Sequence, residues 1–189
     1  MQLTTPRLHI RRFEPTDWEA VHAYTSNEQV MKYIPGGVMT EDDTRRFVEH
    51  HSDESKAEHF PVVLLKENRI IGHIVFHRYH NDHIYEIGWV FHSGYYNQGY
   101  ASEAAQAVLD YAFGTMNIHR LIATCQPDNP PSYRVMEKIG MQREGYFKQC
   151  IPRGDNEWMD EYYYAILEDE WREQMKIRVQ EAVNSNRYE

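Results

Sequence analysis

The most informative stretch of this sequence is Gly94-Tyr-Tyr-Asn-Gln-Gly99-Tyr-Ala101-Ser-Glu-Ala104. Before it, the apolar residues 84–91 are predicted to form a strand, and after it an alanine-rich helix is expected over about 99–113. Such a junction presents unpaired backbone N–H groups at the positive end of a helix dipole. Gly99 and Ala101 carry little side chain that could keep a ligand from this backbone. The stretch is therefore typical of a phosphate or pyrophosphate site, and an ordinary strand-to-helix turn is the alternative.

On either side of this stretch, the hydrophobic pattern predicts strands that come mainly in hairpins. One hairpin is expected around Glu67-Asn68, and a second turn at Asn81-Asp82 leads into the strand of residues 84–91. The predicted strands are residues 7–13, 60–66, 69–77, 84–91, 119–126, 143–150 and 158–166.

Capping boxes and amphipathic spacing predict the other helices. Thr16-Asp-Trp-Glu19 and Thr40-Glu-Asp-Asp43 each open a helix, and residues 132–138 form a short helix that Gly140 ends. The last helix is expected to place near one face Trp171, Met175, Val179 and Ala182. This order of elements predicts an α/β (α+β) fold, in which a mixed, mostly antiparallel sheet of about six to seven strands is flanked by helices. We expect one domain over residues 1–183 and a disordered tail over 184–189.

The composition is typical of a globular cytoplasmic protein. The chain is 41% hydrophobic and 26% charged, and no apolar run approaches the roughly 20 residues that cross a bilayer. Its first residues do not resemble a signal peptide, and its two cysteines form no disulfide or metal pattern. The formal charge of −9 argues against a nucleic-acid partner and favours cationic partners such as amines.

Two other phosphate-binding motifs fit the glycine-containing stretch poorly. Gly94 and Gly99 have the spacing of a P-loop, but Tyr100-Ala101 stands where the lysine and serine or threonine should follow. A dinucleotide-binding fingerprint would need a third glycine where Ala104 stands, and the strand of residues 119–126 ends without an acid to hold a ribose. Neither an NTPase nor a dinucleotide-binding protein is therefore expected.

Several segments together resemble a known enzyme family. They are Leu3-Thr-Thr-Pro-Arg-Leu8, Glu28-Gln-Val-Met-Lys-Tyr33, Glu86-Ile-Gly-Trp89, Gly99-Tyr-Ala-Ser-Glu-Ala104 and the run from Asn129 through Ser132 to Glu137-Lys-Ile-Gly-Met141. In order and spacing they resemble the GCN5-related N-acetyltransferases (GNAT), and within them the ribosomal-protein N-terminal (alanine/serine) acetyltransferase-like group. The match extends over most of the chain.

The resemblance implies a GNAT fold with splayed central strands and acetyl-CoA as the acetyl donor, without a metal. The backbone from about Asn97 to Ser102 would bind the pyrophosphate of coenzyme A, and the pantetheine arm would lie between the splayed strands. The residues that it implies for coenzyme binding are Trp89, Val90, Phe91, Asn97, Gln98, Gly99, Tyr100, Ala101, Ser102, Asn129 and Ser132. The family loop often begins with Arg or Gln followed by Gly, and here Tyr96 and Asn97 occupy those positions.

Glu86 is the candidate base. Strand alternation places it with Ile84, Gly88 and Val90 on one face of residues 84–91. Apolar neighbours should remove water from this carboxylate and raise its pKa, so that it could accept a proton from an amine, directly or through water. A carboxylate paired with a neighbour, or solvated at a sheet edge, is the other interpretation.

The proton for the departing thiolate has several candidate donors. Ser132 follows Asn129-Pro-Pro131 and is expected to act as a helix N-cap, and the resemblance places it near the coenzyme sulfur. The alternative donors are Tyr133, Tyr162, Tyr163 and Tyr164, of which Tyr162 and Tyr164 share a strand face that Tyr163 opposes.

Cysteine and histidine side chains are not expected to carry the chemistry. Cys125 has no basic activator at useful spacing and is interpreted as a core residue. His73 and His77 would lie roughly 13 Å apart on a strand, and His80 with His83 would supply only two ligands. The aromatic residues Tyr24, Tyr33 and Phe47 could line an acceptor pocket or belong to the core.

The predicted function is direct transfer of an acetyl group from acetyl-CoA to a primary amine in a ternary complex. The group resemblance points to a protein N-terminal amine as the acceptor, and a polyamine or an aminoglycoside stays open. A non-catalytic acyl-CoA sensor and a protein without any ligand are the hypotheses from other classes. A homodimer is also open, and neither nucleic acid nor a membrane is an expected partner.

Overall fold

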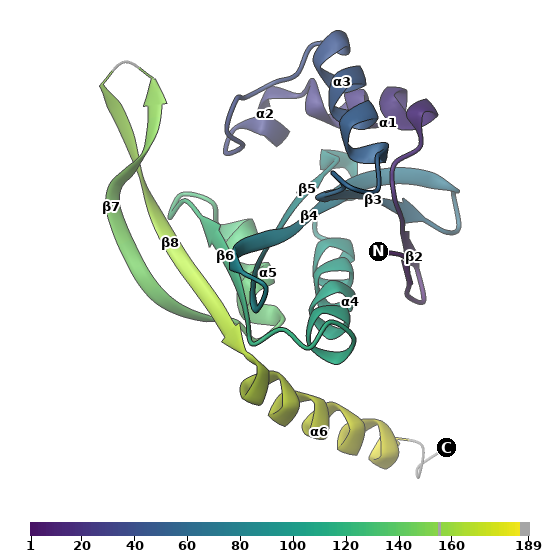
Figure 1. The fold of residues 1–189 in the computed structure, drawn as a ribbon, viewed down its shortest axis with the longest axis vertical. Coiled ribbons are helices and arrows are strands. Elements are labelled where there is room, and N and C mark those ends of the chain that lie inside the picture. Colours follow the sequence, from purple (N-terminus) through teal and green to yellow (C-terminus); the bar gives the residue numbers. More distant parts are fainter. Residues whose placement is uncertain (155, 186–189) are drawn as a thin grey trace.

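The computed structural model describes residues 1–154 and 156–185, and a single sheet forms the centre of the molecule (Figure 1). The strands are β1 (Leu3–Thr4), β2 (Leu8–Ile10), β3 (His59–Leu64), β4 (Arg69–Asn81), β5 (Ile84–Phe91), β6 (Arg120–Cys125), β7 (Gln142–Gly154) and β8 (Glu157–Leu167). Their order in the sheet is β1-β2-β3-β4-β5-β6-β8-β7. Every pair is antiparallel except β5–β6, which is parallel, so the mixed, mostly antiparallel sheet is confirmed.

The sheet has eight strands instead of the six to seven expected, because β1 was not predicted. A turn in which the Thr5 N–H donates to the Leu8 carbonyl folds the two-residue β1 back onto β2 at the sheet edge. Such a short strand has no alternation that a sequence pattern could detect.

The helices are η1 (Pro15–Asp17), α1 (Trp18–Thr25), α2 (Glu28–Met31), α3 (Glu41–Ser52), η2 (Ser93–Tyr95), α4 (Tyr100–Gly114), α5 (Pro130–Lys138) and α6 (Glu168–Ser185). The capping box of Thr40 and Asp43 opens α3 as predicted. The box expected at Thr16 was wrong, because Glu14 and Asp17 form it instead and open the 3₁₀ turn η1. Helix α2 was not predicted, and the Asn27 side chain caps its N-terminus.

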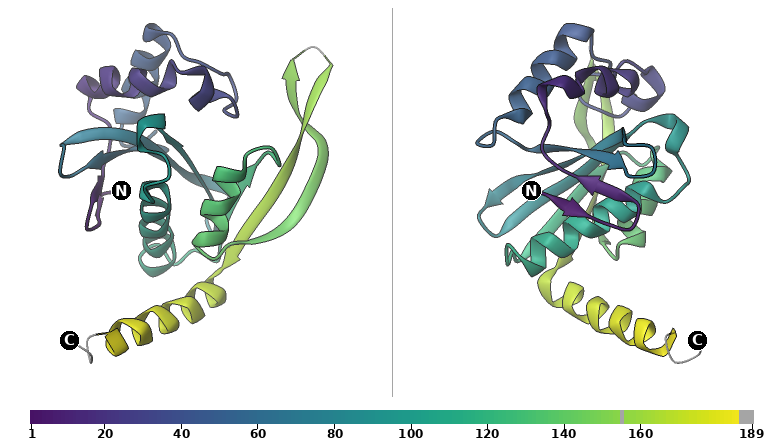
Figure 2. Two further views of the ribbon diagram at one scale, coloured as in Figure 1. Left: turned by 180° about the vertical axis from the view of Figure 1, so that it is seen from behind. Right: turned by 90° about the vertical axis from the view of Figure 1, so that its right-hand side faces the viewer.

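Two layers of helices cover the two faces of the sheet (Figures 1 and 2). Helices α1, α2 and α3 lie over one face, and α4 with α5 lies over the other. Strand β5 contributes to both cores: Ile87 and Phe91 pack on the α4 side, and Val90 packs on the α1–α3 side. The predicted alternation of β5 is thereby confirmed.

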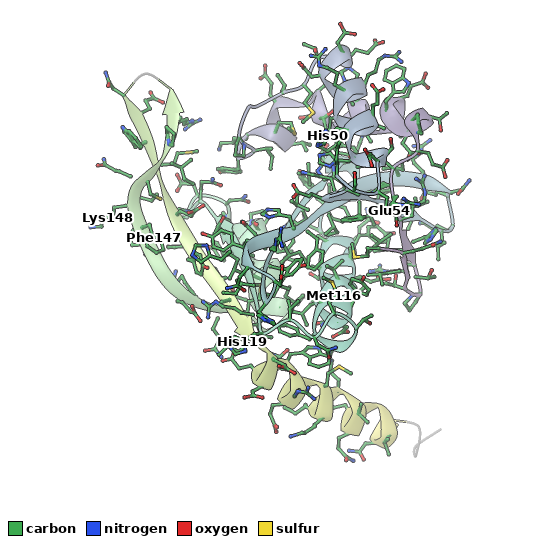
Figure 3. The ribbon with its side chains drawn as sticks, viewed as in Figure 1. His50, Glu54, Met116, His119, Phe147 and Lys148 are labelled. Atoms are coloured by element: carbon green, nitrogen blue, oxygen red, sulfur yellow. The ribbon has the colours of Figure 1, made fainter. Side chains whose placement is uncertain are left out.

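The β7–β8 hairpin extends away from the rest of the sheet as an arm (Figure 1). Phe147 and Lys148 lie on its outer strand, β7, whose residues are mostly exposed (Figure 3). Because the inner strand β8 pairs with β6 only as far as Cys125↔Tyr162, the tip of the arm stands clear of β6.

Helix α6 packs beneath α4 through a face that begins at Trp171. The Trp171 ring stacks on Phe113, and Asp110 accepts hydrogen bonds from Trp171 and Arg178. Val179 was expected on this face but is exposed, because Arg178 instead of Val179 turns toward α4. The predicted disordered tail overlaps the last two residues of α6, and its remainder, 186–189, lies outside the described residues. Among the described residues, no helix has both the length and the apolar character that a membrane crossing requires.

Candidate functional site

The two parallel central strands separate part of the way along their length. Strand β5 pairs with β6 only from Ile84↔Arg120 to Glu86↔Ile122. Beyond that point β5 continues along β4 and β6 continues along β8. In the described part of the chain no strand fills the gap, so backbone groups of β5 from Ile87 onward have a free edge. Glu86 lies at the last paired position, where the gap begins.

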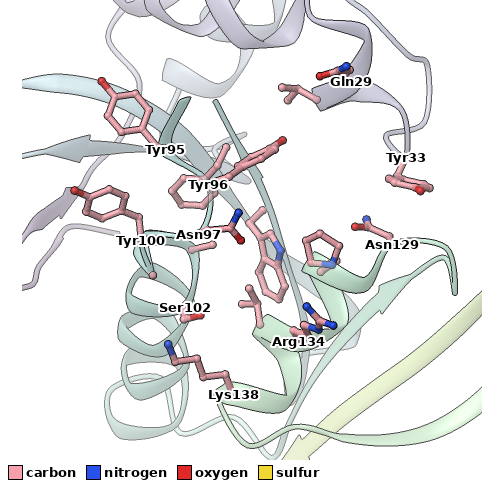
Figure 4. Close-up of a pocket in the computed structure, with 18 of the residues that line it drawn as sticks. Gln29, Tyr33, Tyr95, Tyr96, Asn97, Tyr100, Ser102, Asn129, Arg134 and Lys138 are labelled. Carbon is pink, nitrogen blue, oxygen red and sulfur yellow. The ribbon is translucent and has the colours of Figure 1, made fainter. Parts of the chain in front are cut away.

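A cleft of about 530 Å³ runs from this gap to the N-terminus of α4 (Figure 4). Most of the residues implied for coenzyme binding line it: Trp89, Phe91, Asn97, Gly99, Tyr100, Ala101, Ser102, Asn129 and Ser132. They come from β5, from the following loop and α4, and from the start of α5. Val90 and Gln98 do not line it, because Val90 faces the opposite core and the Gln98 side chain donates to the Gly94 carbonyl.

The loop before α4 has the backbone form of an anion-binding turn. Asn97 and Gly99 both have left-handed conformations, with φ of 58° and 80°, and curve the chain around its own N–H groups. Gly99 is the N-cap of α4, and no described side chain caps this N-terminus. Its first N–H groups therefore stay available to a ligand, as the sequence predicted.

Arg7 holds this loop from the side of β2. Its Nη1 donates to the Gln98 carbonyl at 3.0 Å, and its Nε donates to the Glu103 carboxylate at 2.5 Å. The guanidinium also lies 4.4 Å from the centre of the Tyr100 ring. Because the charge of Arg7 is paired with Glu103, Arg7 mainly stabilises the conformation of the loop and adds little positive charge for an anionic ligand.

Two basic side chains of α5, Arg134 and Lys138, line the cleft and were missed in the sequence (Figure 4). They lie four residues apart, a spacing that places both on one helix face and could have revealed them. They supply positive charge near the α4 N-terminus, where Tyr96 stands in place of the usual family arginine or glutamine. The free N–H groups and these two cations together fit a diphosphate.

Ser132 lines the cleft but does not cap α5, so that prediction was wrong. Asn129 is the N-cap, and Pro130 and Pro131 occupy the first helical turn, where proline needs no N–H partner. The Ser132 hydroxyl instead lies beside the thiol of Cys125. Cys125 is buried, and burial raises its pKa to about 12, which confirms its interpretation as an inert core residue.

The tyrosines of β8 differ in whether their hydroxyl groups are free to donate a proton. Tyr164 is buried, donates to Glu137 at 3.0 Å, and has its pKa raised to about 12 by burial and by that carboxylate. Tyr162 packs against Tyr133 on the same side, and Tyr163 lies on the opposite face beside Arg120. Their predicted alternation is confirmed, and none of them lines the cleft.

Glu86 does not line this cleft, and its side chain is on the face of β5 opposite α4. Its carboxylate is 3.7 Å from Nε2 of His77 and accepts a hydrogen bond of 3.4 Å from the Thr124 hydroxyl. Loss of hydration raises the pKa of Glu86, while His77 lowers it and Glu161 raises it further, with a net upward shift. The predicted direction of this shift is confirmed.

A second cleft of about 490 Å³ lies between the segment after α2 and the β7–β8 arm. Its lining is Glu28, Met31, Lys32, Tyr33, Ile34, Pro35, Gly36, Gly37, Val38, Gln126, Ile151, Pro152, Arg153 and Met159. It meets the first cleft at Tyr33 and Ile34, which line both. Met159 is two residues from Glu161 on the same face of β8.

Tyr33 bridges the place where the two clefts meet. Its hydroxyl donates to the Asp128 carbonyl at 2.5 Å and so joins the end of α2 to the loop before α5. Tyr24 and Phe47, the other aromatic candidates, belong to the core with α1 and α3. Within residues 1–154 and 156–185, no group of three or more His, Cys, Asp or Glu side chains is arranged to hold a metal ion.

The chain is similar to known acetyltransferases in sequence and in structure. The family model of the acetyltransferase (GNAT) domain matches residues 7–142. The uncharacterized N-acetyltransferase YnaD of Bacillus subtilis (strain 168) is 64% identical over 90% of this chain and 99% of its own length. The crystal structure of a GNAT-family acetyltransferase from Bacillus anthracis has 65% identity and a TM-score of 0.85, and the match covers 89% of this chain and 99% of that one.

A more distant structure has the same fold and contains coenzyme A. It is RimL, a ribosomal L7/L12 alpha-N-protein acetyltransferase in complex with coenzyme A, with 20% identity and a TM-score of 0.76. The match covers 88% of this chain and 98% of that one. The family model matches most of the chain, and the separated central strands and the uncapped N-terminus of α4 agree with that match. The protein is therefore a member of the GNAT family of N-acetyltransferases.

Proposed function

We propose that this acetyltransferase moves an acetyl group from acetyl-CoA directly to the N-terminal amine of a protein. The observation that carries the proposal is the meeting of two clefts at Tyr33 and Ile34. Glu86, the candidate base, lies at the last position where β5 and β6 are paired. One cleft suits the donor and the other suits the acceptor. Their meeting allows both substrates to be bound when the amine attacks.

The first cleft supports a role for acetyl-CoA as the donor. Its loop N–H groups, with Arg134 and Lys138, suit the diphosphate of the coenzyme. The free backbone edge of β5 suits the amide groups of the pantetheine arm, which can pair with it as a strand would. The RimL structure, which contains coenzyme A, supports the same donor here.

The chemistry requires removal of protons from the amine and delivery of one to the thiolate. Glu86, with its raised pKa, is suited to accept a proton from the amine, directly or through a water molecule. Ser132 is the proposed donor to the thiolate because it alone among the candidate donors lines the first cleft. Tyr164 is a poor donor, since its hydroxyl already bonds to Glu137.

The second cleft supports a peptide acceptor over a polycation. Its lining is mainly apolar, with Met31, Ile151 and Met159 among its side chains. Its charged residues are one acid, Glu28, and two bases, Lys32 and Arg153, so polyamines and aminoglycosides would meet unfavourable charge. RimL, named for its action on ribosomal L7/L12, favours a ribosomal protein as the acceptor. A homodimer and a cytoplasmic location stay predictions.

Thiol release tests this proposal. The protein is incubated with acetyl-CoA and short peptides that begin with Ala or Ser, with the same peptides acetylated at the N-terminus, and with spermidine and an aminoglycoside. We expect thiol release and acetylated product only with the free peptides, and a fall of kcat by about a hundredfold in Glu86→Gln. Turnover with the polycations alone would overturn the assignment of the acceptor. Binding of acetyl-CoA without turnover of any amine would indicate a sensor instead.

A further inference from the structure

His77 faces Glu86 from the neighbouring strand. The two residues are direct partners in the register of β4 and β5. Nε2 of His77 lies 3.7 Å from Oε2 of Glu86, and the other carboxylate oxygen, Oε1, accepts from Thr124. The hydroxyl of Thr124 therefore orients the carboxylate, and Oε2 is the oxygen turned to the imidazole.

The contact of the other imidazole nitrogen, Nδ1, defines the tautomer of His77. Nδ1 lies 3.1 Å from the Arg78 carbonyl, which can only accept, so Nδ1 is the N–H donor in that contact. In neutral His77 the lone pair of Nε2 is then directed at Glu86. The distance of 3.7 Å between Nε2 and Oε2 is longer than a hydrogen bond, so a proton on Oε2 reaches Nε2 through a small side-chain rotation or through one water molecule. The resulting imidazolium would be stabilised by the carboxylate.

A second proton site would help the base to release its proton in each turnover. An ammonium nitrogen loses two protons when it becomes an amide nitrogen. One of them is balanced by the proton that the coenzyme thiolate takes up, and the other must leave the site. Glu86 alone holds one proton and has to release it before it can act again.

We propose that His77 is a positioning residue of this site and takes over from Glu86 a proton that the acceptor amine has lost. This inference rests on the function proposed above. The N–H bond of the amine breaks as the O–H bond of Glu86 forms, and that O–H bond then breaks as the Nε2–H bond of His77 forms. The side chain of His77 is 27% exposed, which lets solvent take the proton.

The charges around Glu86 and His77 favour a proton shared between these two side chains. His59 on β3 interacts with His77 and stays neutral, because burial lowers its pKa to about 2. Glu161 on β8 adds negative charge, and Thr124 on β6 adds a hydroxyl. The negative charge favours a proton on the pair, and the neutral His59 does not oppose a positive charge on His77.

The test compares His77→Gln and His77→Ala with a matched control, His80→Gln, an exposed histidine on the same strand. We expect His77→Gln to lower kcat by about tenfold or more, with little change in the KM for acetyl-CoA. When His77 carries a proton, its charge lowers the pKa of Glu86. His77→Gln removes that effect, so the acidic limb of the kcat/KM profile should move to higher pH. Imidazole in the buffer should restore part of the kcat of His77→Ala. The control should behave as the wild type.

The outcomes separate this inference from the proposed function. If Glu86→Gln is inactive but His77→Gln keeps the kcat and pH profile of the wild type, His77 has no part in proton transfer and the function stands. A lower kcat with an unshifted pH profile and no response to imidazole would assign His77 a purely structural role and overturn the inference. Absence of turnover in the wild type would overturn both.

Discussion

At the scale of single residues, the glycine-containing loop depends on one backbone conformation. Gly99 has φ of 80°, a region that costs a residue with a Cβ roughly 1–2 kcal/mol. A Cβ there would meet Arg7 at 3.4 Å, an ordinary contact, so space alone does not require glycine. The requirement is conformational: the turn at Gly99 aims the first N–H groups of α4 into the cleft.

Gly99→Ala should weaken coenzyme binding. Relief of the strain would move the loop away from its N–H geometry, and we expect the Kd of coenzyme A to rise about tenfold in titration calorimetry. Gly36→Ala is the control, because Gly36 also has a left-handed φ, 88°, but lies in the second cleft with no atom within 4 Å of a Cβ. Equal Kd values for coenzyme A in the two variants would show that the backbone conformation at Gly99 does not contribute to coenzyme binding.

At the scale of elements, α5 combines an early start with a charged face. The two prolines begin the helix at Pro130, two residues before the expected start, because proline suits the first turn and Asn129 takes the N-cap position. Ser132 is thereby freed from capping and lies in the cleft. Arg134 and Lys138 follow on the helix and line the same cleft, and Lys138 extends toward Ser102 in the first turn of α4 (Figure 4).

The double variant Arg134→Ala/Lys138→Ala should bind coenzyme A about tenfold more weakly at low salt. The loss should shrink as salt is added, because exposed charges are screened within about 10 Å at 0.1 M. Arg172→Ala/Lys176→Ala is the matched control, since it removes an arginine and a lysine four residues apart from the exposed face of α6. An equal loss of affinity in both double variants would contradict a specific role for α5.

At the scale of the whole molecule, the layer of α1–α3 is packed on the sheet partly through histidines. His51 from α3, His59 from β3 and His73 from β4 lie around Phe47, with ring centres of His51 and His59 4.3 Å apart. Burial lowers the pKa of His73 to about 3 and that of His59 to about 2, and lowers that of His51. In the folded protein these rings therefore remain neutral, although the unfolded chain binds protons below pH 6.5.

The stability of the fold should consequently fall as the pH falls below about 6.5. The unfolded state takes up protons that the folded state excludes, at a cost of about 1.4 kcal/mol per pH unit for each such histidine. Urea unfolding between pH 7.5 and 5 measures the slope. His59→Phe removes one of these histidines, so the dependence of the unfolding free energy on pH should become shallower by about one proton. The substitution breaks no hydrogen bond of Nδ1, which has no partner among the described residues. His80→Gln, which alters an exposed ring, should leave the slope unchanged, and an unchanged slope in His59→Phe would contradict the prediction.

The sequence by itself determined the features that depend on neighbours within a few residues. The alternation of Ile84–Phe91, the capping box of Thr40 and Asp43 and the uncapped turn at Gly99 were all predicted from local patterns and confirmed. They were predictable because strand pleat, helix capping and left-handed turns are short-range effects. The separation of the central strands was predicted only from the family resemblance, because no local sequence pattern indicates it.

Only the tertiary structure decided which distant residues meet. His77 lies opposite Glu86 because of the β4–β5 register, and Tyr33 reaches Asp128 because α2 lies over the end of the sheet. The packing of α5 beside α4 brings Arg134 and Lys138 into the cleft that the loop before α4 also lines. These contacts join segments whose separation in sequence carries no periodic signal, since they are set by burial of shared apolar faces and by strand pairing.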